Sequence, residues 1–275
     1  MPEAITEELR ELPFQELALR LHCAQPADGG RYPTLIVIHE AFGVDAHIEA
    51  LTRRFAHAGY HAIAPDLFSL DPFGRTVTPD EIKETFRLRM ALPAARRMDP
   101  TAADEALGNL PPERAARLRA VMTWFGQRDM AAVVPPLIET IDWARRRADT
   151  TDAVAMTGFC YGGGVTLRLA FAGAPLTAAA PFYGQNPPLE QATQVRCPLL
   201  LMYGRNDPFI MPGVPALLDA LQQAQRPYEM HLYEQAGHAF LNDTRPDAYQ
   251  KEAAEDAWGQ LLRFFARHLD ATAAG

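Results

Sequence analysis

The sequence of 275 residues predicts an α/β fold with a mostly parallel central sheet and helices on both of its faces. Two observations carry this prediction: short apolar runs recur along the chain, and helical repeats lie between them. Apolar runs of this length are typical of strands buried on both faces. Strands that alternate with helices form βαβ units, whose strands pair in parallel. The expected strands are 34–39, 61–64, 153–157, 178–182, 199–203 and 229–233.

Three stretches repeat their apolar residues at the spacing of a helix and are expected to cover the sheet. These stretches are 130–141, 214–221 and 258–265. Segment 15–23 alternates instead, and we expect an antiparallel strand or a hairpin at one edge of the sheet. We find no linker or internal repeat, so a single domain spanning 1–275 is expected.

Residues 69–127 contain no strand pattern. Thr78 to Glu81 (TPDE) is typical of a helix start, because it combines a capping box with proline at the first helical position. A second helical pattern follows Pro111 and Pro112, with Leu118, Val121, Met122 and Phe125 on one face. We therefore expect a helical insertion over the active site, at the carboxyl edge of the sheet where such folds bind ligands.

Composition argues against several classes of function. A formal net charge of −8 argues against nucleic acid or an anionic membrane as the main partner. The three cysteines, Cys23, Cys160 and Cys197, are scattered, so neither a zinc site nor a disulfide framework is expected. No apolar run is long enough to span a membrane, and the acidic first residues do not resemble a secretory signal. A cytoplasmic protein with reduced thiols is expected.

The most informative stretch is 153–164 (AVAMTGFCYGGG), in which an expected strand runs directly into the motif G-x-C-x-G. In the related G-x-S-x-G motif the nucleophile occupies a sharp turn between strand and helix, and the glycines allow close packing. Cys160 in that place is a strong nucleophile as a thiolate, and the helix amino terminus favours its charge. The alternative is a buried cysteine beside a phosphate-binding loop. However, the motif lies past mid-chain and has no Gly-Lys-Ser/Thr.

Two further residues complete a catalytic pattern. Asp207 follows the expected strand 199–203, and His238 follows the expected strand 229–233. Taken singly, Asp207 suits a turn and His238 is one of eight histidines. Together with Cys160 they keep the order nucleophile, acid, base that this architecture requires. We expect His238 to take the thiol proton and Asp207 to orient its imidazole.

The chain resembles the dienelactone hydrolase (carboxymethylenebutenolidase) family of α/β-hydrolases. The matching motifs are HEAFGVDAHI at 39–48, APDLF at 64–68, GFCYGGG at 158–164, YGRNDPFI at 203–210 and YEQAGHAFLNDTRP at 233–246. The resemblance covers nearly the whole chain outside 69–127. It implies an α/β-hydrolase fold and hydrolysis of a small-molecule lactone or carboxylic ester without a cofactor or a metal.

The resemblance also implies a catalytic role for Glu40, which it places beside the thiol. A carboxylate in a desolvated pocket has a raised proton affinity and can accept the thiol proton. From the residues alone, the alternative for Glu40 is a solvent-exposed acid in a loop. The backbone N–H groups of Ala41 and Tyr161 flank the point where a carbonyl would bind, so we expect them to form the oxyanion hole.

One departure from the family leaves the substrate open. Family members that act on dienelactone hold its carboxylate with two arginines, and those places are Leu70 and Asn242 here. Neither residue replaces a bidentate guanidinium. The candidate arginines to compensate for them are Arg75, Arg87, Arg89 and Arg245. A thioesterase or acyltransferase on the same triad remains an alternative, as does a non-catalytic ligand binder or thiol redox sensor. The sequence does not indicate the oligomeric state.

Overall fold

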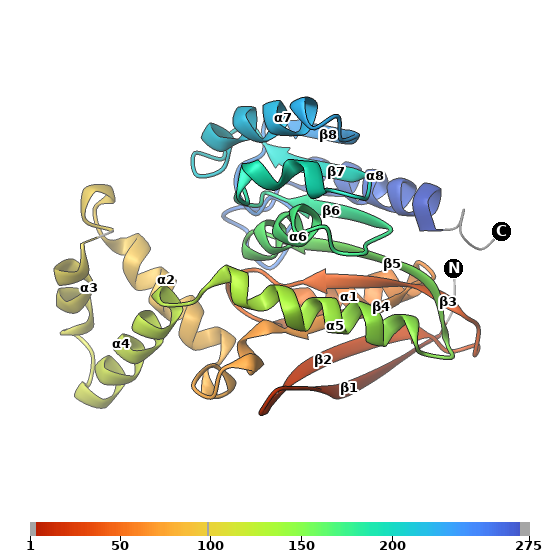
Figure 1. Cartoon of the computed structure of the whole chain (residues 1–275). Helices are drawn as coiled ribbons and strands as arrows, with labels where there is room; N and C mark the ends of the chain where they lie inside the picture. The colour runs from red at the N-terminus through yellow and green to blue at the C-terminus, as the bar shows by residue number, and fades with distance from the viewer. Residues whose placement is uncertain (1–3, 98, 270–275) are drawn as a thin grey trace.

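The computed structural model describes residues 4–97 and 99–269, which form an α/β fold around one eight-stranded sheet (Figure 1). The strand order is β1-β2-β4-β3-β5-β6-β7-β8. The strands are β1 (Ile5–Phe14), β2 (Leu17–Pro26), β3 (Tyr32–Ile38), β4 (His61–Asp66), β5 (Thr150–Phe159), β6 (Ala178–Phe182), β7 (Leu199–Gly204) and β8 (Tyr228–Tyr233).

Strands β3 to β8 pair in parallel, as the pattern of apolar runs predicts. All six lie within three residues of their expected bounds, and β6 has the expected bounds. At the other edge, β1 and β2 form an antiparallel hairpin, and β2 pairs antiparallel with β4. The hairpin is confirmed, but its first strand lies in the acidic stretch 5–14, which the sequence pattern did not mark.

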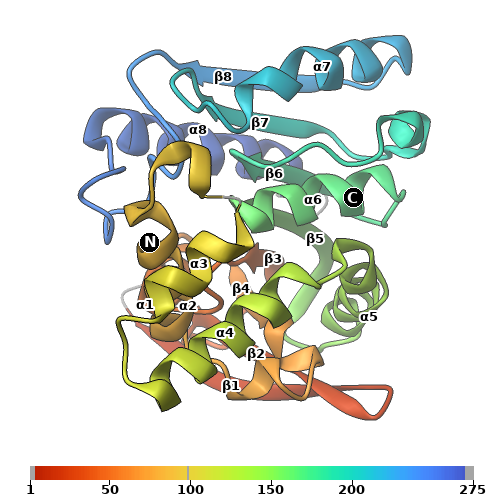
Figure 2. The same cartoon turned by 90° about the vertical axis from the view of Figure 1, so that its left-hand side faces the viewer.

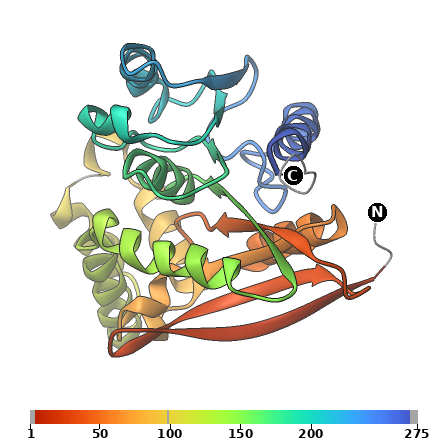
Figure 3. The same ribbon diagram turned by 45° about the vertical axis from the view of Figure 1, so that its right-hand side comes forward.

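Helices cover both faces of the sheet (Figure 3). Successive side chains of a strand point to opposite faces, so Ile36 packs with one set of helices and Leu35 with the other. The first set is α5 (Val134–Arg145), α6 (Tyr161–Phe171) and α7 (Val214–Gln223). The second set is α1 (Ala46–His57) and α8 (Lys251–Leu269).

The repeat expected as one helix over 130–141 is divided in the structure. Met130–Val133 forms a 3₁₀ turn, and α5 begins only at Val134. The cause is local: Pro135 and Pro136 lack a backbone N–H, which suits the first turn of an α-helix and not its interior. Further 3₁₀ turns are Leu67–Leu70, Gly74–Thr76, Ala94–Arg96, Leu189–Gln194 and Met211–Gly213.

The described residues of 69–127 contain helices and no strand. They form α2 (Pro79–Ala91), α3 (Pro100–Leu107) and α4 (Pro112–Gly126), which lie in front of the carboxyl edge of the sheet (Figure 2). The expected capping box is present. The Thr78 hydroxyl accepts from the Glu81 N–H at 3.3 Å, and the Glu81 carboxylate accepts from the Thr78 N–H at 2.9 Å.

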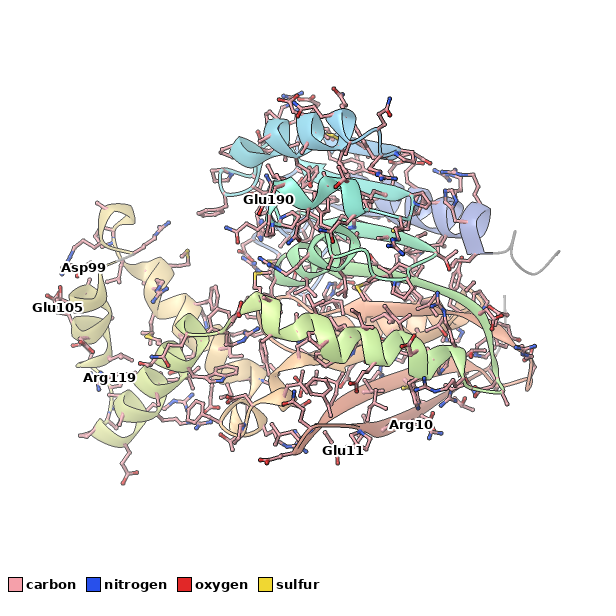
Figure 4. The ribbon with its side chains drawn as sticks, in the orientation of Figure 1. Arg10, Glu11, Asp99, Glu105, Arg119 and Glu190 are labelled. Atoms are coloured by element: carbon pink, nitrogen blue, oxygen red, sulfur yellow. The ribbon has the colours of Figure 1, made fainter. Side chains whose placement is uncertain are left out.

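The insertion has an apolar inner side and a charged outer side. Phe68, Ile82 and Val121 are buried and pack with the aromatic side chains of Phe42, Phe73, Phe86, Trp124, Phe125 and Tyr161. Asp99, Glu105 and Arg119 lie on the part of the insertion farthest from the sheet (Figure 4). The insertion is therefore amphipathic, and its aromatic side faces the loops that follow the strands.

Candidate active site

Cys160 is the single residue between β5 and α6. Its backbone has φ 55° and ψ −110°, a strained conformation for a residue with a side chain. Two hydrogen bonds hold it there. The Cys160 N–H donates to the Phe182 carbonyl at 3.1 Å, and the Cys160 carbonyl accepts from the Gly164 N–H at 3.1 Å. The structure thus has the sharp strand-to-helix turn that the motif predicts.

The glycines on either side of Cys160 allow this turn. A Cβ atom at Gly158 would lie 2.2 Å from the Gly162 carbonyl oxygen. A Cβ atom at Gly162 would lie 2.3 Å from the carbonyl oxygen of Ile38, at the end of β3. Both separations are too short for any side chain, so the close approach of β3, β5 and α6 requires glycine at both positions.

Asp207 and His238 meet at the same edge of the sheet, beyond the ends of β7 and β8. Asp207 Oδ2 lies 2.6 Å from His238 Nδ1, and the aspartate side chain is 1% exposed. Its other oxygen accepts from the backbone N–H groups of Phe209 at 3.0 Å and Ile210 at 3.2 Å. These bonds fix the carboxylate so that it orients the imidazole.

The protonation of His238 is set by opposing influences. Burial disfavours the charged imidazolium, but hydrogen bonds to Asp207 and Cys160 outweigh it and raise the pKa of His238 to about 10. With Nδ1 bonded to Asp207, the Nε2 atom is left for the thiol. The structure therefore brings the three residues of the expected triad together in the expected order of contacts.

Glu40 lies two residues beyond the end of β3 and is 3% exposed, so it is not a solvated loop acid. Asn242 Nδ2 donates to Glu40 Oε2 at 2.7 Å, and the Tyr183 hydroxyl donates to Oε1 at 3.5 Å. Burial raises the pKa of Glu40, although nearby His47 and the bond from Asn242 oppose this rise. Asn242, one of the two positions where the family has arginine, thus contacts this carboxyl.

Tyr183 links these groups, and no sequence motif selects it. It follows β6 directly, is fully buried, and has φ 37°. Its ring centroid lies 5.3 Å from that of His238, and its hydroxyl reaches Glu40. Burial, together with the neighbouring Glu40 carboxyl and Cys160 thiol, raises the pKa of Tyr183, so its hydroxyl remains a hydrogen-bond donor. Its position after the strand next to β5 is the signal that could have marked it.

Ala41 and Tyr161, the expected oxyanion-hole donors, lie in neighbouring loops. Ala41 follows Glu40 in the loop after β3, and Tyr161 begins α6 directly after Cys160. β3 and β5 are neighbours in the sheet, so the two loops lie side by side. The first N–H groups of a helix have no acceptor within it, which leaves the Tyr161 N–H for another partner.

The arginines considered as substitutes have different surroundings. Arg75 bonds the Ala18 carbonyl and Glu11, and so is tied to the β1–β2 hairpin. Arg245 pairs with Asp247, and Arg87 and Arg89 lie on α2. Leu70 packs against the core. An arginine that the sequence analysis did not select, Arg128, lies against the residue that follows the nucleophile: its guanidinium carbon is 4.6 Å from the centroid of the Tyr161 ring.

The insertion contacts the site through the loop after β3. The rings of Phe42 and Phe86 meet edge to face at 5.4 Å, and Lys83 Nζ lies 2.7 Å from Asp45 Oδ2. Asp45 in turn caps α1 by accepting from the Ile48 N–H. Helix α2 thus packs on the loop that carries Glu40.

Within residues 4–97 and 99–269, no group of three or more His, Cys, Asp or Glu side chains is arranged to hold a metal ion. Cys23 and Cys197 are buried, and neither forms a disulfide. No helix in the described part of the chain is both long and apolar enough to cross a membrane.

Comparison with known proteins identifies the family that has this architecture. The model of the dienelactone hydrolase family matches residues 19–269. Two relatives named "Putative carboxymethylenebutenolidase" are each 31% identical. The one from Saccharolobus solfataricus aligns over 85% of this chain and 88% of its own, and the one from Yersinia pestis over 94% and 86%.

Solved structures agree. A protein from Klebsiella pneumoniae named "Putative Dienelactone Hydrolase" has 30% identity and a TM-score of 0.72, covering 96% of this chain and 99% of that one. The dienelactone hydrolase-like promiscuous phosphotriesterase P91, from metagenomic libraries, shares the fold at 20% identity and a TM-score of 0.68, over 96% of this chain and 99% of that one. The chain belongs to the dienelactone hydrolase family of α/β-hydrolases and is a hydrolase.

Proposed function

We propose that this protein hydrolyses a small lactone or carboxylic ester, with Cys160 as nucleophile, His238 as acid and base, and Asp207 as the residue that orients His238. One observation carries the proposal. At the strained turn, the Cys160 thiol is hydrogen-bonded to an imidazole whose other nitrogen lies 2.6 Å from a buried carboxylate. An arrangement of this kind activates a nucleophile.

Acyl transfer follows from these contacts in two steps. The Cys160 sulfur attacks the carbonyl carbon, and the carbonyl oxygen takes the negative charge, which the Ala41 and Tyr161 N–H groups stabilise. Collapse of this intermediate expels the alkoxide, which takes its proton from the His238 imidazolium. Water then gives a proton to His238 and attacks the thioester, which releases the acid and restores the thiol. A pKa of about 10 for His238 favours the imidazolium in the resting enzyme.

Glu40 is proposed as a second proton acceptor for the thiol. It is buried, it contacts no cationic side chain in the hydrogen bonds that the structure describes, and burial raises its pKa. A carboxyl group whose pKa is raised holds a proton more readily, so it can accept the thiol proton. Asn242 and Tyr183 hold its two oxygens, so the carboxyl is oriented as well as tuned.

The direct test uses alanine at each reacting residue and a chromogenic aryl ester such as p-nitrophenyl acetate. Cys160→Ala and His238→Ala are each expected to lower kcat by at least about 10⁴-fold, because residues that act as a unit fail together. Cys197→Ala is the matched control, since this thiol is buried outside the site and its turnover should match the wild type. Hydrolysis that survives in Cys160→Ala would contradict the proposed nucleophile.

A further inference from the structure

His39 is the residue just before Glu40 and is fully buried. Its Nδ1 lies 2.6 Å from the Glu40 carbonyl oxygen, and its Nε2 lies 3.3 Å from the Leu67 backbone nitrogen. A backbone N–H only donates, so Nε2 is the acceptor and Nδ1 carries the proton that bonds the Glu40 carbonyl. Burial lowers the pKa of His39 to about 4, so the ring keeps this neutral form at neutral pH.

The bond from His39 has a consequence for the next residue. The Glu40 carbonyl and the Ala41 N–H belong to one peptide group, which is planar and trans, so they point in opposite directions. Holding the carbonyl oxygen against His39 therefore fixes the direction of the Ala41 N–H. The Gly43 N–H donates to the same oxygen at 3.4 Å and reinforces this orientation.

The same imidazole also supports the second donor. The ring of Tyr161 stacks on that of His39 with 5.8 Å between centroids and 21° between planes. The Arg128 guanidinium carbon lies 4.6 Å from the Tyr161 centroid and 4.1 Å from the centroid of Phe68. Phe68 meets His39 edge to face at 4.7 Å. One cluster of rings therefore joins the loop after β3, the start of α6 and the segment that follows α4.

We propose that His39 is a positioning residue of the oxyanion hole, which orients the Ala41 N–H through the Glu40 carbonyl and supports Tyr161 by stacking. Arg128 lies two residues after the end of α4, and its guanidinium packs on the Tyr161 ring from the side of the insertion. This inference rests on the proposed function in one respect: it takes the Ala41 and Tyr161 N–H groups as the donors to the oxyanion.

A second buried histidine shows that burial alone does not imply such a role. His61, the first residue of β4, is also fully buried, and its pKa is also lowered to about 4. Yet neither of its ring nitrogens has a hydrogen-bond partner among the described residues. His61 lies at the start of its strand, whereas the site lies beyond the strand ends. It is therefore the matched control for His39.

The test substitutes His39→Phe, which keeps the stacked ring and removes the donor to Glu40. The expected loss in kcat for aryl ester hydrolysis is about 10²-fold to 10³-fold, the size seen when one oxyanion donor is lost, with KM nearly unchanged. Alkylation of Cys160 by iodoacetamide forms no oxyanion, so its rate should stay at the wild-type value. His61→Phe should change neither rate. His39→Gln can donate to the Glu40 carbonyl again and should recover most of the lost kcat.

A ligand that does not turn over separates this inference from the proposed function. A ¹³C-labelled benzaldehyde adds the Cys160 sulfur to its carbonyl carbon, the thiol proton passes to the oxygen, and ¹³C NMR detects the thiohemiacetal. His39→Phe should weaken this adduct by at least about 10-fold, since the oxygen occupies the oxyanion hole. If the wild type hydrolyses no ester and His39→Phe still weakens the adduct, the proposed function is refuted and the role of His39 is supported. Wild-type adduct affinity and wild-type kcat in His39→Phe would overturn the inference.

Arg128→Met provides the second variant and decides the case if His39→Phe does not fold. Methionine covers the Tyr161 ring without the charge, and we expect kcat to fall by about 10-fold with an unchanged alkylation rate. A rise in KM confined to esters that carry a free carboxylate, with kcat unchanged, would show instead that Arg128 binds substrate. That result would overturn its positioning role.

Discussion

The parallel strands end at the carboxyl edge of the sheet and begin at its amino edge, and each of these two edges holds a cysteine, a histidine and an aspartate. The pKa of the histidine is shifted in opposite directions at the two edges. At the carboxyl edge, Cys160 is hydrogen-bonded to His238, and the pKa of His238 is raised to about 10. At the amino edge, Cys23 and His61 line a cavity of about 160 Å³ together with Asp149. Burial raises the pKa of the Cys23 thiol to about 12 and lowers that of His61 to about 4. Cys23 therefore stays a thiol and His61 stays a neutral imidazole at neutral pH, so the two do not form a reactive pair.

The difference lies in the third residue. Asp207 accepts from His238, while Asp149 is occupied by Arg147, whose Nε lies 2.8 Å from its carboxylate. No carboxylate is hydrogen-bonded to His61 among the described residues. Asp149 and Glu8 raise its pKa only through space, and desolvation together with the charge of Arg147 outweighs them. Proximity of a thiol, an imidazole and a carboxylate is thus insufficient. A thiol beside an imidazole becomes an activated nucleophile when a carboxylate is hydrogen-bonded to that imidazole.

Asp207→Asn should make the carboxyl edge resemble the amino edge and has the largest expected effect in this comparison. Without the carboxylate, the imidazole loses its preferred tautomer and its stabilised charge, and kcat for an aryl ester should fall by about 10⁴-fold. Alkylation of Cys160 at about pH 6, where an ordinary thiol is protonated, should slow in parallel. The control is Asp149→Asn, which should leave both rates unchanged. Unchanged low-pH alkylation in Asp207→Asn would show that the contrast between the edges has another cause.

Glu40→Gln sharpens the comparison, because Glu40 is buried between two neutral donors, whereas Asp149 in the amino-edge cavity is partly exposed and paired with Arg147. Glutamine is isosteric and removes the ability to exchange a proton. We expect kcat to fall by about 10³-fold, with a change in the acidic limb of its pH profile, as for a lost acid–base group. Asn242→Asp, which removes the amide donor to Glu40 and adds a second carboxyl group, should shift that limb toward higher pH. A pH profile of Glu40→Gln identical to the wild type would exclude proton exchange by Glu40.

The central strands could be predicted, and the three residues proposed as the triad could be selected, because their signals are local. β3, β5 and β7 are buried on both faces, so each is a continuous apolar run, whereas β1 at the edge has both faces partly exposed and shows no clear pattern. Cys160, Asp207 and His238 each follow a recognisable strand, and their order is itself a motif.

The residues that escaped prediction act through contacts between distant segments. His39 and Arg128 meet the expected site residue Tyr161 only in the folded chain, and no spacing connects them to it. Tyr183 is likewise a single aromatic residue in a loop, whose importance depends on contact with Glu40 and His238. Asn242 was noted as a missing arginine, but its bond to Glu40 is a tertiary fact. Such residues become visible only when the packing of the loops is known.

His61 and His238 should also respond to pH with opposite signs, and this is the smallest expected effect. The unfolded pKa of histidine is near 6.5. His61 in the folded chain has a pKa of about 4, so the unfolded state binds more protons between these values, and stability falls as pH drops from about 6.5 to 4. His238 has a raised pKa, so its contribution is full below about 6.5 and is lost as pH rises toward 10.

Urea unfolding of the wild type, His61→Phe and His238→Asn across this range measures both limbs. Since one pKa unit corresponds to about 1.4 kcal/mol, His61 accounts for about 3 kcal/mol of the free energy of unfolding lost in acid. His61→Phe should remove that part and leave the alkaline limb intact, while His238→Asn should flatten only the alkaline limb. If His61→Phe and the wild type lose the same free energy in acid, the amino-edge histidine is not held neutral by burial. In that case, the remaining difference between the two edges is the carboxylate hydrogen-bonded to His238, which His61 lacks among the described residues.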